Sequence, residues 1–373
     1  MRRRALLLLT MVAFILAAAG GTAMAAPENG SIYFHSSDNL YSVDPTMSSR
    51  QIVRKSYYDL SINTFDMSRD GRTIVYDQDC LCPRDFSGPL YTIRRDSHAD
   101  AFFDTARAKV DITNLWDCSS VPPTPDFDCT YDQVKTMPRF SPDGETIYFV
   151  GQYILGPEEK TSGLYSVPTG GGEATRIPIL NPDGSSRLIG TFALSHDGTK
   201  FAINGGPGVY TVPVSGGPSR LVNRDPCGIT RYPSFSPDDK TIVYARVTRK
   251  DDNCTGSGTA IQTLFTTPVD NDGTQPGTPL FPEDVANPDT HGHKWYPTFS
   301  PDGKYVAFAH WRNDGPDSVA FAPATGGSID NIDGTLCAFC QPVWFERLPD
   351  TTIESGPSGT VGSTSAEFGF SSD

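Results

Sequence analysis

Short apolar runs alternate with turn-forming residues through most of the chain, and one unit of this pattern recurs five times. In each copy an apolar residue leads through a Ser into an Asp-containing turn, and a run rich in β-branched and aromatic residues follows. The turns lie at 65–71, 140–144, 194–198, 235–239 and 299–303, and the runs at 73–76, 146–149, 200–203, 241–244 and 305–308. Such runs between turn residues predict strands, so each copy predicts a β-hairpin.

The consensus turn is Ser-Pro-Asp-Gly, and its residue types suit a tight turn. Proline sets φ at the first central position, aspartate is tolerated next, and glycine takes the left-handed position. Asp239 replaces the glycine once, and aspartate can adopt that conformation at some cost. We therefore interpret the recurring aspartates as turn residues rather than calcium ligands; they are Asp70, Asp143, Asp197, Asp238 and Asp302.

A second pair of strands is predicted after each hairpin. Its first member is typified by Leu-Tyr-Ser-Val at 164–167, and in several repeats a Gly-rich turn and a short outer strand such as 219–222 come next. Each repeat thus has four strands, the unit of a propeller blade. The serines at 195 and 236 stand 41 residues apart, which matches a blade of about 40–45 residues without insertions.

The two ends of the repeat region complete each other. Residues 31–34 match the second strand of a blade that lacks a first, and 341–345 match a first strand, as 232–236 do. A C-terminal strand would then close the ring and remove the exposed sheet edge. The expected fold is all-β, a six-bladed β-propeller of four-stranded blades; seven blades remain an alternative if the long 68–141 interval contains another.

The N-terminal segment has the features of a secretory signal peptide. Three arginines precede an apolar stretch at 6–19, and Ala23-Met24-Ala25 forms a small-residue cleavage site. The alternative is an uncleaved anchor helix, although spanning a bilayer takes about 20 apolar residues. The expected organisation is a signal peptide at 1–25, a propeller at 26–348 and a tail at 349–373.

Charge and cysteine content narrow the functional classes. The formal net charge is −14, and loss of the three signal-peptide arginines would make it −17. This disfavours nucleic-acid binding, which needs a basic surface. The eight cysteines of an exported chain predict disulfide bonds. The best pair is Cys227–Cys254, which flanks one hairpin, and Cys118–Cys129 is next; both would staple loops on the rim opposite the Ser-Pro-Asp-Gly turns.

The Pro-x-Phe-Ser-Pro-Asp-Gly repeat followed by Leu-Tyr-x-Val resembles the WD-like repeats of the TolB family of propellers. The resemblance covers about 31–347 and implies the fold, whereas such propellers serve both binding proteins and peptidases. TolB has a preceding α/β domain for which 26–31 leaves no room. The Gly-x-Ser-x-Gly element of the peptidases' hydrolase domain is missing. The tail at 349–373 resembles the opening strands of bacterial Ig-like modules, or else is disordered.

Candidate binding residues lie where the innermost strands begin. Arg231, Tyr232, Trp295 and Tyr296 are expected on the rim and in the central channel. They suggest a secreted or periplasmic scaffold that binds an envelope or extracellular protein or peptide, without a cofactor and more as a binding protein than as an enzyme. No membrane span is expected after signal cleavage.

The alternative function is a metal-dependent polysaccharide lyase or another hydrolytic enzyme. The histidines near the last repeat, His291, His293 and His310, could hold a divalent metal. Oligogalacturonate lyases, propellers with related repeats, use a similar cluster. The spacing is not a defined motif, so this reading requires the three side chains to converge on one ion.

Overall fold

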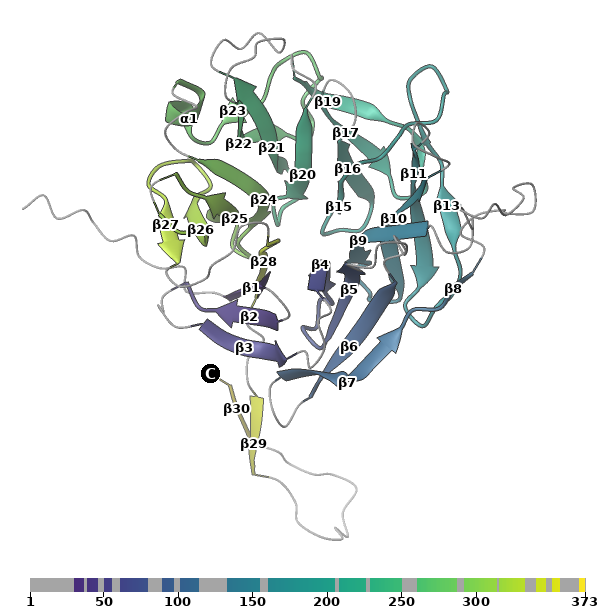
Figure 1. Cartoon of the computed structure of the whole chain (residues 1–373), viewed down its shortest axis with the longest axis vertical. Coiled ribbons are helices and arrows are strands. Elements are labelled where there is room, and N and C mark those ends of the chain that lie inside the picture. Colours follow the sequence, from purple (N-terminus) through teal and green to yellow (C-terminus); the bar gives the residue numbers. More distant parts are fainter. Residues whose placement is uncertain are drawn as a thin grey trace, which may run out of the picture.

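The computed structural model shows six four-stranded antiparallel blades around a central axis (Figure 1). The residues that the structure describes are 30–36, 39–45, 50–55, 61–79, 89–96, 101–113, 133–154, 160–204, 208–225, 229–249, 260–286, 292–313, 315–332, 340–346, 351–355 and 369–372. The six-bladed prediction is confirmed, and each blade matches one predicted repeat.

The blades are numbered from the first complete one. Blade 1 comprises β4 (Ser61–Met67), β5 (Thr73–Asp79), β6 (Leu90–Asp96) and β7 (Ala101–Lys109). Blade 2 comprises β9 (Gln133–Phe140), β10 (Thr146–Ile154), β11 (Lys160–Pro168) and β13 (Thr175–Ile177). Blade 3 comprises β15 (Phe192–Leu194), β16 (Lys200–Asn204), β17 (Gly208–Pro213) and β19 (Arg220–Arg224).

The remaining three blades continue around the ring. Blade 4 comprises β20 (Thr230–Phe235), β21 (Thr241–Arg249), β22 (Ala260–Pro268) and β23 (Thr278–Pro279). Blade 5 comprises β24 (His293–Phe299), β25 (Tyr305–Trp311), β26 (Ser318–Pro323) and β27 (Asp330–Ile332). Blade 6 comprises β28 (Val343–Phe345), β1 (Ser31–Ser36), β2 (Asn39–Val43) and β3 (Arg50–Lys55).

Blade 6 closes the ring by joining the two ends of the repeat region. β28 pairs antiparallel with β1, with Ile32 opposite Trp344. The first strand of this blade therefore comes from the C-terminal side and the other three from the N-terminal side. This is the closure that the sequence predicted: β28 pairs with the inner edge of β1 and becomes the innermost strand of the blade.

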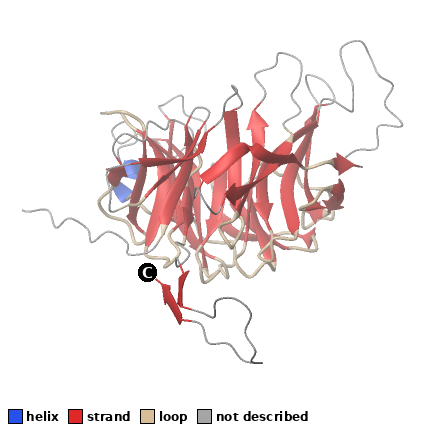
Figure 2. Ribbon diagram, turned by 90° about the horizontal axis from the view of Figure 1, so that it is seen from below, coloured by secondary structure: helices blue, strands red, loops and turns tan. Residues whose placement is uncertain are grey.

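Short elements complete the described structure. Three strand pairs are parallel. The outer strands β3 and β7 join blade 6 to blade 1, and the other two pairs are β8 (Ile112–Thr113) with β12 (Gly172–Glu173) and β14 (Ile179–Leu180) with β18 (Gly217–Pro218). The one described helix is α1 (Pro282–Ala286). In the tail, β29 (Thr351–Ser355) pairs with β30 (Gly369–Ser372) as a separate two-stranded sheet below the ring (Figure 2).

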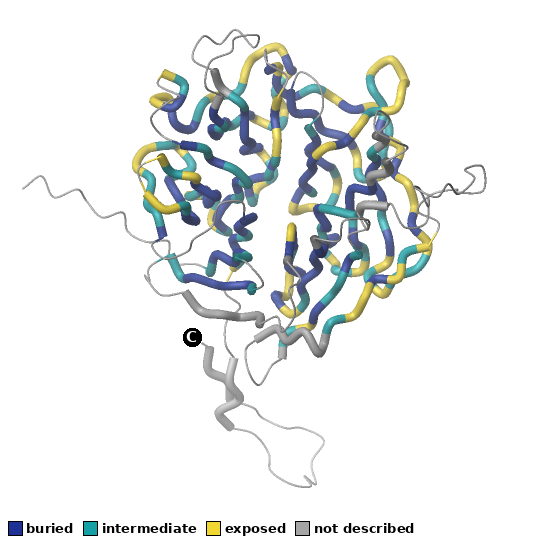
Figure 3. The backbone as a smooth tube through the Cα atoms, in the orientation of Figure 1, coloured by how far each residue is buried: buried dark blue, intermediate teal, exposed yellow. Residues whose placement is uncertain are grey.

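The hydrophobic core consists of contacts between neighbouring blades. The second strand of a blade is buried on both faces, so Ile74, Val75 and Tyr76 are all fully inaccessible to solvent. Six apolar clusters each join adjacent blades; in one of them Trp344 of blade 6 packs against Phe321 of blade 5, with ring centroids 5.9 Å apart. Figure 3 shows burial along the strands and exposure at their turns. This two-sided burial explains the almost continuous apolar runs.

The Ser-Pro-Asp-Gly turns share one hydrogen-bond pattern. In blade 3 the Ser195 hydroxyl donates to Asp197 Oδ1 at 2.6 Å, and Lys200 N donates back to Ser195 Oγ at 3.0 Å. The same Ser-to-Asp bond recurs in blades 1, 2, 4 and 5. These bonds support the structural interpretation of the five aspartates. We call the side of the ring that carries these turns the turn face.

Several predicted features fall outside the described residues. These include the signal peptide at 1–25, His291, and the pairs Cys227–Cys254 and Cys118–Cys129, which stay predictions. Cys340 is the one described cysteine, and it is buried and disulfide-bonded. No helix in the described part of the chain is long and apolar enough to cross a membrane.

Candidate functional site

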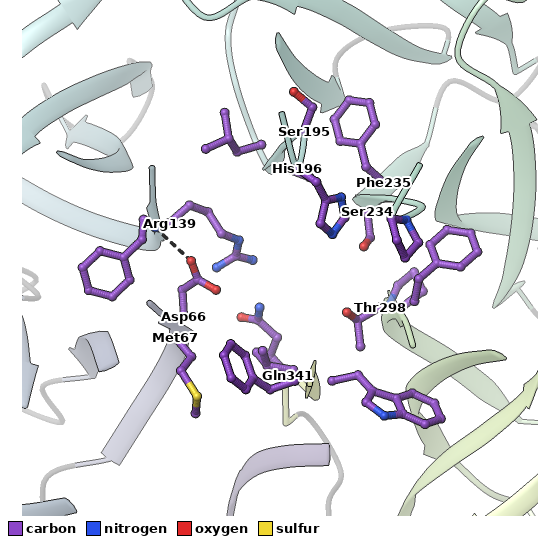
Figure 4. A pocket seen from close by; sticks show the side chains of 18 of the residues that line it. Asp66, Met67, Arg139, Ser195, His196, Ser234, Phe235, Thr298 and Gln341 are labelled. Atoms are coloured by element: carbon purple, nitrogen blue, oxygen red, sulfur yellow. Dashed lines mark hydrogen bonds between the residues drawn. The ribbon is translucent and has the colours of Figure 1, made fainter. Parts of the chain in front are cut away.

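The centre of the ring holds a cavity of about 450 Å³ that residues from all six blades line. Its wall runs along the innermost strands to the turn face, where Pro142, His196, Pro237 and Pro301 lie. At its deep end, farthest along the strands from those turns, are Met137, Tyr232, Tyr296 and Gln341. Figure 4 shows polar side chains from several blades pointing toward the middle.

Three of the deep residues have a backbone conformation that is rare outside glycine. Met137, Tyr232 and Tyr296 have φ of 56°, 52° and 51°, and each precedes a proline. In blades 4 and 5 the strand register shifts at this point, between Arg231 and Ser234 and between Trp295 and Thr298. A bulge of this kind re-aims a side chain, which accounts for the presence of both tyrosines on the cavity wall.

The two tyrosines pack on each other across blades 4 and 5. Their ring centroids are 4.0 Å apart with an interplanar angle of 37°. Burial, together with the neighbouring Tyr232, raises the pKa of the Tyr296 phenol, so this hydroxyl stays protonated. The pair forms an aromatic floor with polar tips, a surface that suits an amphipathic ligand.

Buried side chains behind the wall fix the deep residues. Asp77 accepts hydrogen bonds from Thr64 N at 2.6 Å and from Thr136 Oγ1 at 2.7 Å. Thr64 Oγ1 in turn accepts from Met137 N at 2.9 Å. Burial raises the pKa of Asp77, although these hydrogen bonds oppose the shift. The chain of bonds links blade 1 to blade 2 and holds Met137 in its left-handed conformation.

Asp66 and Arg139 bring opposite charges to the cavity from neighbouring blades. Asp66 Oδ2 accepts from Phe140 N at 2.9 Å, and Arg139 Nη1 donates to Pro138 O at 2.7 Å. Burial raises the pKa of Asp66, while the Arg139 charge lowers it in part. Burial also lowers the pKa of Arg139, against the pull of Asp66 and Asp77, but a guanidinium remains charged in proteins.

The remaining polar wall residues include an imidazole at the turn face. His196 Nδ1 lies 3.2 Å from Asp239 Oδ1, and the same carboxylate accepts from His196 N at 2.8 Å. Ser234 and Thr298 occupy positions equivalent to Arg139 in blades 4 and 5, and all three face the cavity (Figure 4). The chamber therefore combines hydroxyl, amide, carboxylate, guanidinium and imidazole groups on an apolar frame.

The four predicted binding residues separate into two groups. Tyr232 and Tyr296 line the cavity, whereas Arg231 and Trp295 are not among its lining residues. Arg231 is exposed, and Trp295 packs in an aromatic cluster with His293 and Trp311. The sequence placed the binding surface on the rim opposite the turns, but this cavity runs from mid-channel to the turn face.

The described histidines of the predicted metal site do not converge. In the β24–β25 ladder His293 lies opposite Trp311, and Lys294 lies opposite His310. Because successive strand residues point to opposite faces, His293 and His310 point apart. His293 Nδ1 accepts from Gln262 N at 3.2 Å, and His310 Nδ1 lies 2.8 Å from Asn331 Oδ1. The described residues contain no group of three or more metal-ligating side chains.

The sequence patterns gave no binding role to Asp66, Arg139 or His196. Their signal is positional. Aligning the repeats on their serines places Asp66 and Arg139 at the same inward-facing position as Ser234 and Thr298. Neighbouring blades thus carry opposite charges at one equivalent inward position. A channel with only a structural role would not need charged residues there.

The fold and the central cavity define a six-bladed β-propeller with a potential ligand chamber on its axis. Among solved structures, putative TolB from Agrobacterium tumefaciens is similar, with a TM-score of 0.52 and 16% identity over 86% of this chain and 99% of that one. TolB from Acinetobacter baumannii gives a TM-score of 0.53 and 15% identity over 86% of this chain and 68% of that one.

A third similar structure shows how widely this architecture is used. Kuenenia stuttgartiensis hydrazine synthase gives a TM-score of 0.54 at 10% identity, over 86% of this chain and 47% of that one. No family model and no curated protein matches the chain. At these identities the likeness shows the fold alone, so the function is argued from the site.

Proposed function

We propose that this protein is an exported binding propeller that takes a peptide segment of a protein partner into its central cavity. The observation that carries the proposal is the chamber of about 450 Å³ with the Tyr232–Tyr296 pair at its deep end. Concave sites with an apolar lining and a few placed polar groups suit ligand capture. Export is supported by the signal-like sequence at 1–25.

The polar lining favours binding over hydrolysis. His196 is an imidazole on the cavity wall, and it contacts Asp239. In the described part of the chain, no hydrogen bond joins His196 to a serine hydroxyl, as a nucleophile-activating pair would require. The Ser195 and Ser141 hydroxyls are committed to turn aspartates instead.

The test is selection from a random peptide library on immobilised protein. Ser234→Trp would fill the cavity from blade 4, whereas Ser185→Trp adds the same bulk on an exposed turn and serves as the control. Peptides enriched on the wild type should bind the Ser185→Trp variant equally and lose at least about tenfold in affinity for Ser234→Trp, a cost of about 1.4 kcal/mol. Failure to enrich any peptide, or equal binding to both variants, would refute the proposal.

A further inference from the structure

The deep end of the cavity contains a buried amide with no partner. Gln341 is 7% exposed, and its Oε1 has no hydrogen-bond partner in the described structure. The Gln341 backbone N–H donates to His35 Nε2 at 3.4 Å, so the backbone is anchored while the side-chain oxygen is left without a donor. Figure 4 shows this side chain aimed into the chamber. A buried acceptor without a donor is costly and points to a ligand N–H.

Arg139 brings a cation with unused donors to the same chamber. Its Nη1 donates to Pro138 O at 2.7 Å and to Phe65 O at 3.4 Å, which fixes the position of the guanidinium. No hydrogen bond joins its Nη2 or Nε to any residue within the described ranges. Figure 4 shows the guanidinium pointing toward the middle of the cavity. A fixed guanidinium with a free edge matches the geometry of a carboxylate.

A chain end is the part of a peptide that carries a carboxylate, the group that the free edge of Arg139 fits. The Tyr232–Tyr296 pair and Met137 stand at the deep end, and the wall reaches the turn face. From this combination we infer that the cavity captures the C-terminal end of a peptide, with its carboxylate on Arg139 and a nearby amide N–H on Gln341 Oε1. This inference rests on the proposed function, and it specifies which part of the peptide enters.

A peptide N-terminus is the opposite candidate, with Asp66 as its partner. The Asp66 carboxylate already accepts from Phe140 N at 2.9 Å and lies in the field of the Arg139 charge. A ligand ammonium would therefore meet a carboxylate that is already compensated, and it would leave Gln341 Oε1 without a donor. The free donors of Arg139 and the free acceptor of Gln341 together fit a carboxyl end.

The experiment compares three forms of one random hexapeptide pool. The forms have a free carboxylate, a C-terminal carboxamide, or an acetylated N-terminus with a free carboxylate, and mass tags identify them after capture on the protein. We expect the two carboxylate forms to be retained about tenfold or more over the carboxamide. Equal retention of acid and amide forms overturns the inference, and loss of retention on N-acetylation favours the Asp66 alternative and also overturns it.

Variants locate the preference on the wall. Arg139→Gln should abolish the discrimination between acid and amide, whereas Arg224→Gln, the same charge change at an exposed position outside the cavity, should keep it. Discrimination that persists in Arg139→Gln, shown to be folded by near-UV circular dichroism, overturns the assignment. The wild-type comparison needs no variant, so a misfolded Arg139→Gln leaves the test intact.

The outcomes separate this inference from the proposed function. If Ser234→Trp abolishes retention but the acid and amide forms are retained equally, the protein still binds peptides in the cavity and only the assignment to a chain end is wrong. Absence of retention for every form removes both.

Discussion

The backbone N–H of Tyr232 donates a hydrogen bond to the hydroxyl of Thr191 at 2.9 Å, which ties the start of blade 3 to the innermost strand of blade 4. The same hydroxyl lies 3.0 Å from Asn204 Oδ1, and Asn204 Nδ2 donates to Thr230 O at 2.8 Å. Blades 1 and 2 repeat this arrangement through Asp77, Thr64 and Met137. In both places a threonine from one blade fixes a left-handed residue in the next.

Replacing Thr191 with valine should destabilise the protein by about 1–3 kcal/mol, because the partly buried Tyr232 N–H loses its acceptor while the side-chain shape is kept. Urea unfolding monitored by fluorescence measures the change. The control is Thr278→Val at an exposed position of β23, where about 0.5 kcal/mol or less is expected. Identical unfolding curves for the two variants would show that the link between the blades contributes little.

Asp239 holds a conformation that glycine adopts in the other four repeats. Its φ is 56°, compared with 69° at Gly198. Its carboxylate crosses to the neighbouring turn, where Oδ1 accepts from His196 N at 2.8 Å and Oδ2 accepts from Asp197 N at 2.9 Å. The backbone strain is thus offset by two charge-assisted hydrogen bonds between blades 3 and 4.

Asp239→Gly should therefore destabilise the protein by about 1 kcal/mol, even though it relieves the left-handed strain. The stability of Asp239→Asn should lie between those of the wild type and Asp239→Gly, because asparagine tolerates this conformation and retains one acceptor oxygen. Thermal unfolding of the three proteins gives the order. A glycine variant more stable than the wild type would mean that the strain outweighs the bonds between the turns.

The sequence was sufficient for the fold because the repeat encodes every blade in the same way. Serine, aspartate and glycine recur at fixed turn positions, and the apolar runs follow from burial between blades. Tyr232 and Tyr296 were expected at the central channel, but their backbone conformation was not predicted. They enter the cavity through bulges at Tyr-Pro, and no local rule says that a residue before proline will adopt a φ near 50°.

The predicted metal site also shows that nearness in the sequence does not fix where side chains point. His293 and His310 are close in the repeat, but strand alternation puts them on opposite faces of β24–β25, and neither side chain is aimed at the other. Charged wall residues such as Arg139 depend on the alignment of all six innermost strands, which a single repeat does not show. Local patterns therefore predicted the strands, whereas the composition of the chamber requires the inward positions of all the repeats to be compared.

His35 lies where the ring closes, and its environment predicts sensitivity to acid. Burial lowers the pKa of His35 to about 4, from 6.5 in an exposed histidine. The neutral ring accepts the Gln341 N–H through Nε2, and a protonated ring could not. Between pH 6.5 and 4 the unfolded chain binds a proton at this site that the folded chain excludes, so stability falls as the pH falls.

The slope from this one residue should approach about 1.4 kcal/mol per pH unit within that window and vanish below pH 4. His35→Asn, which places at this site the residue that blade 3 has at Asn204, should remove this component. Urea unfolding of the two proteins at pH 7, 6, 5 and 4 measures the difference. Parallel stability curves for wild type and variant would show that His35 titrates alike in both states.

Replacing Gln341 should raise the stability of the protein and lower its affinity for peptides. Its buried Oε1 has no partner, and a buried unsatisfied acceptor costs about 1–3 kcal/mol. Gln341→Leu replaces the amide with an apolar group of similar size and keeps the backbone N–H that donates to His35. Folding should therefore become more favourable by about 1 kcal/mol, while peptides selected on the wild type bind about tenfold more weakly.

Urea unfolding and anisotropy titration with a selected, labelled peptide measure the two effects on the same samples. Gln275→Leu makes the same exchange at an exposed position and should change the stability by no more than about 0.5 kcal/mol, with binding unaltered. A destabilised Gln341→Leu would mean that the amide already has a partner in the free protein, such as an ordered water. A stabilised variant that binds as the wild type does would exclude Gln341 from ligand recognition. Only gain of stability together with loss of affinity fits a polar group that is retained for a ligand.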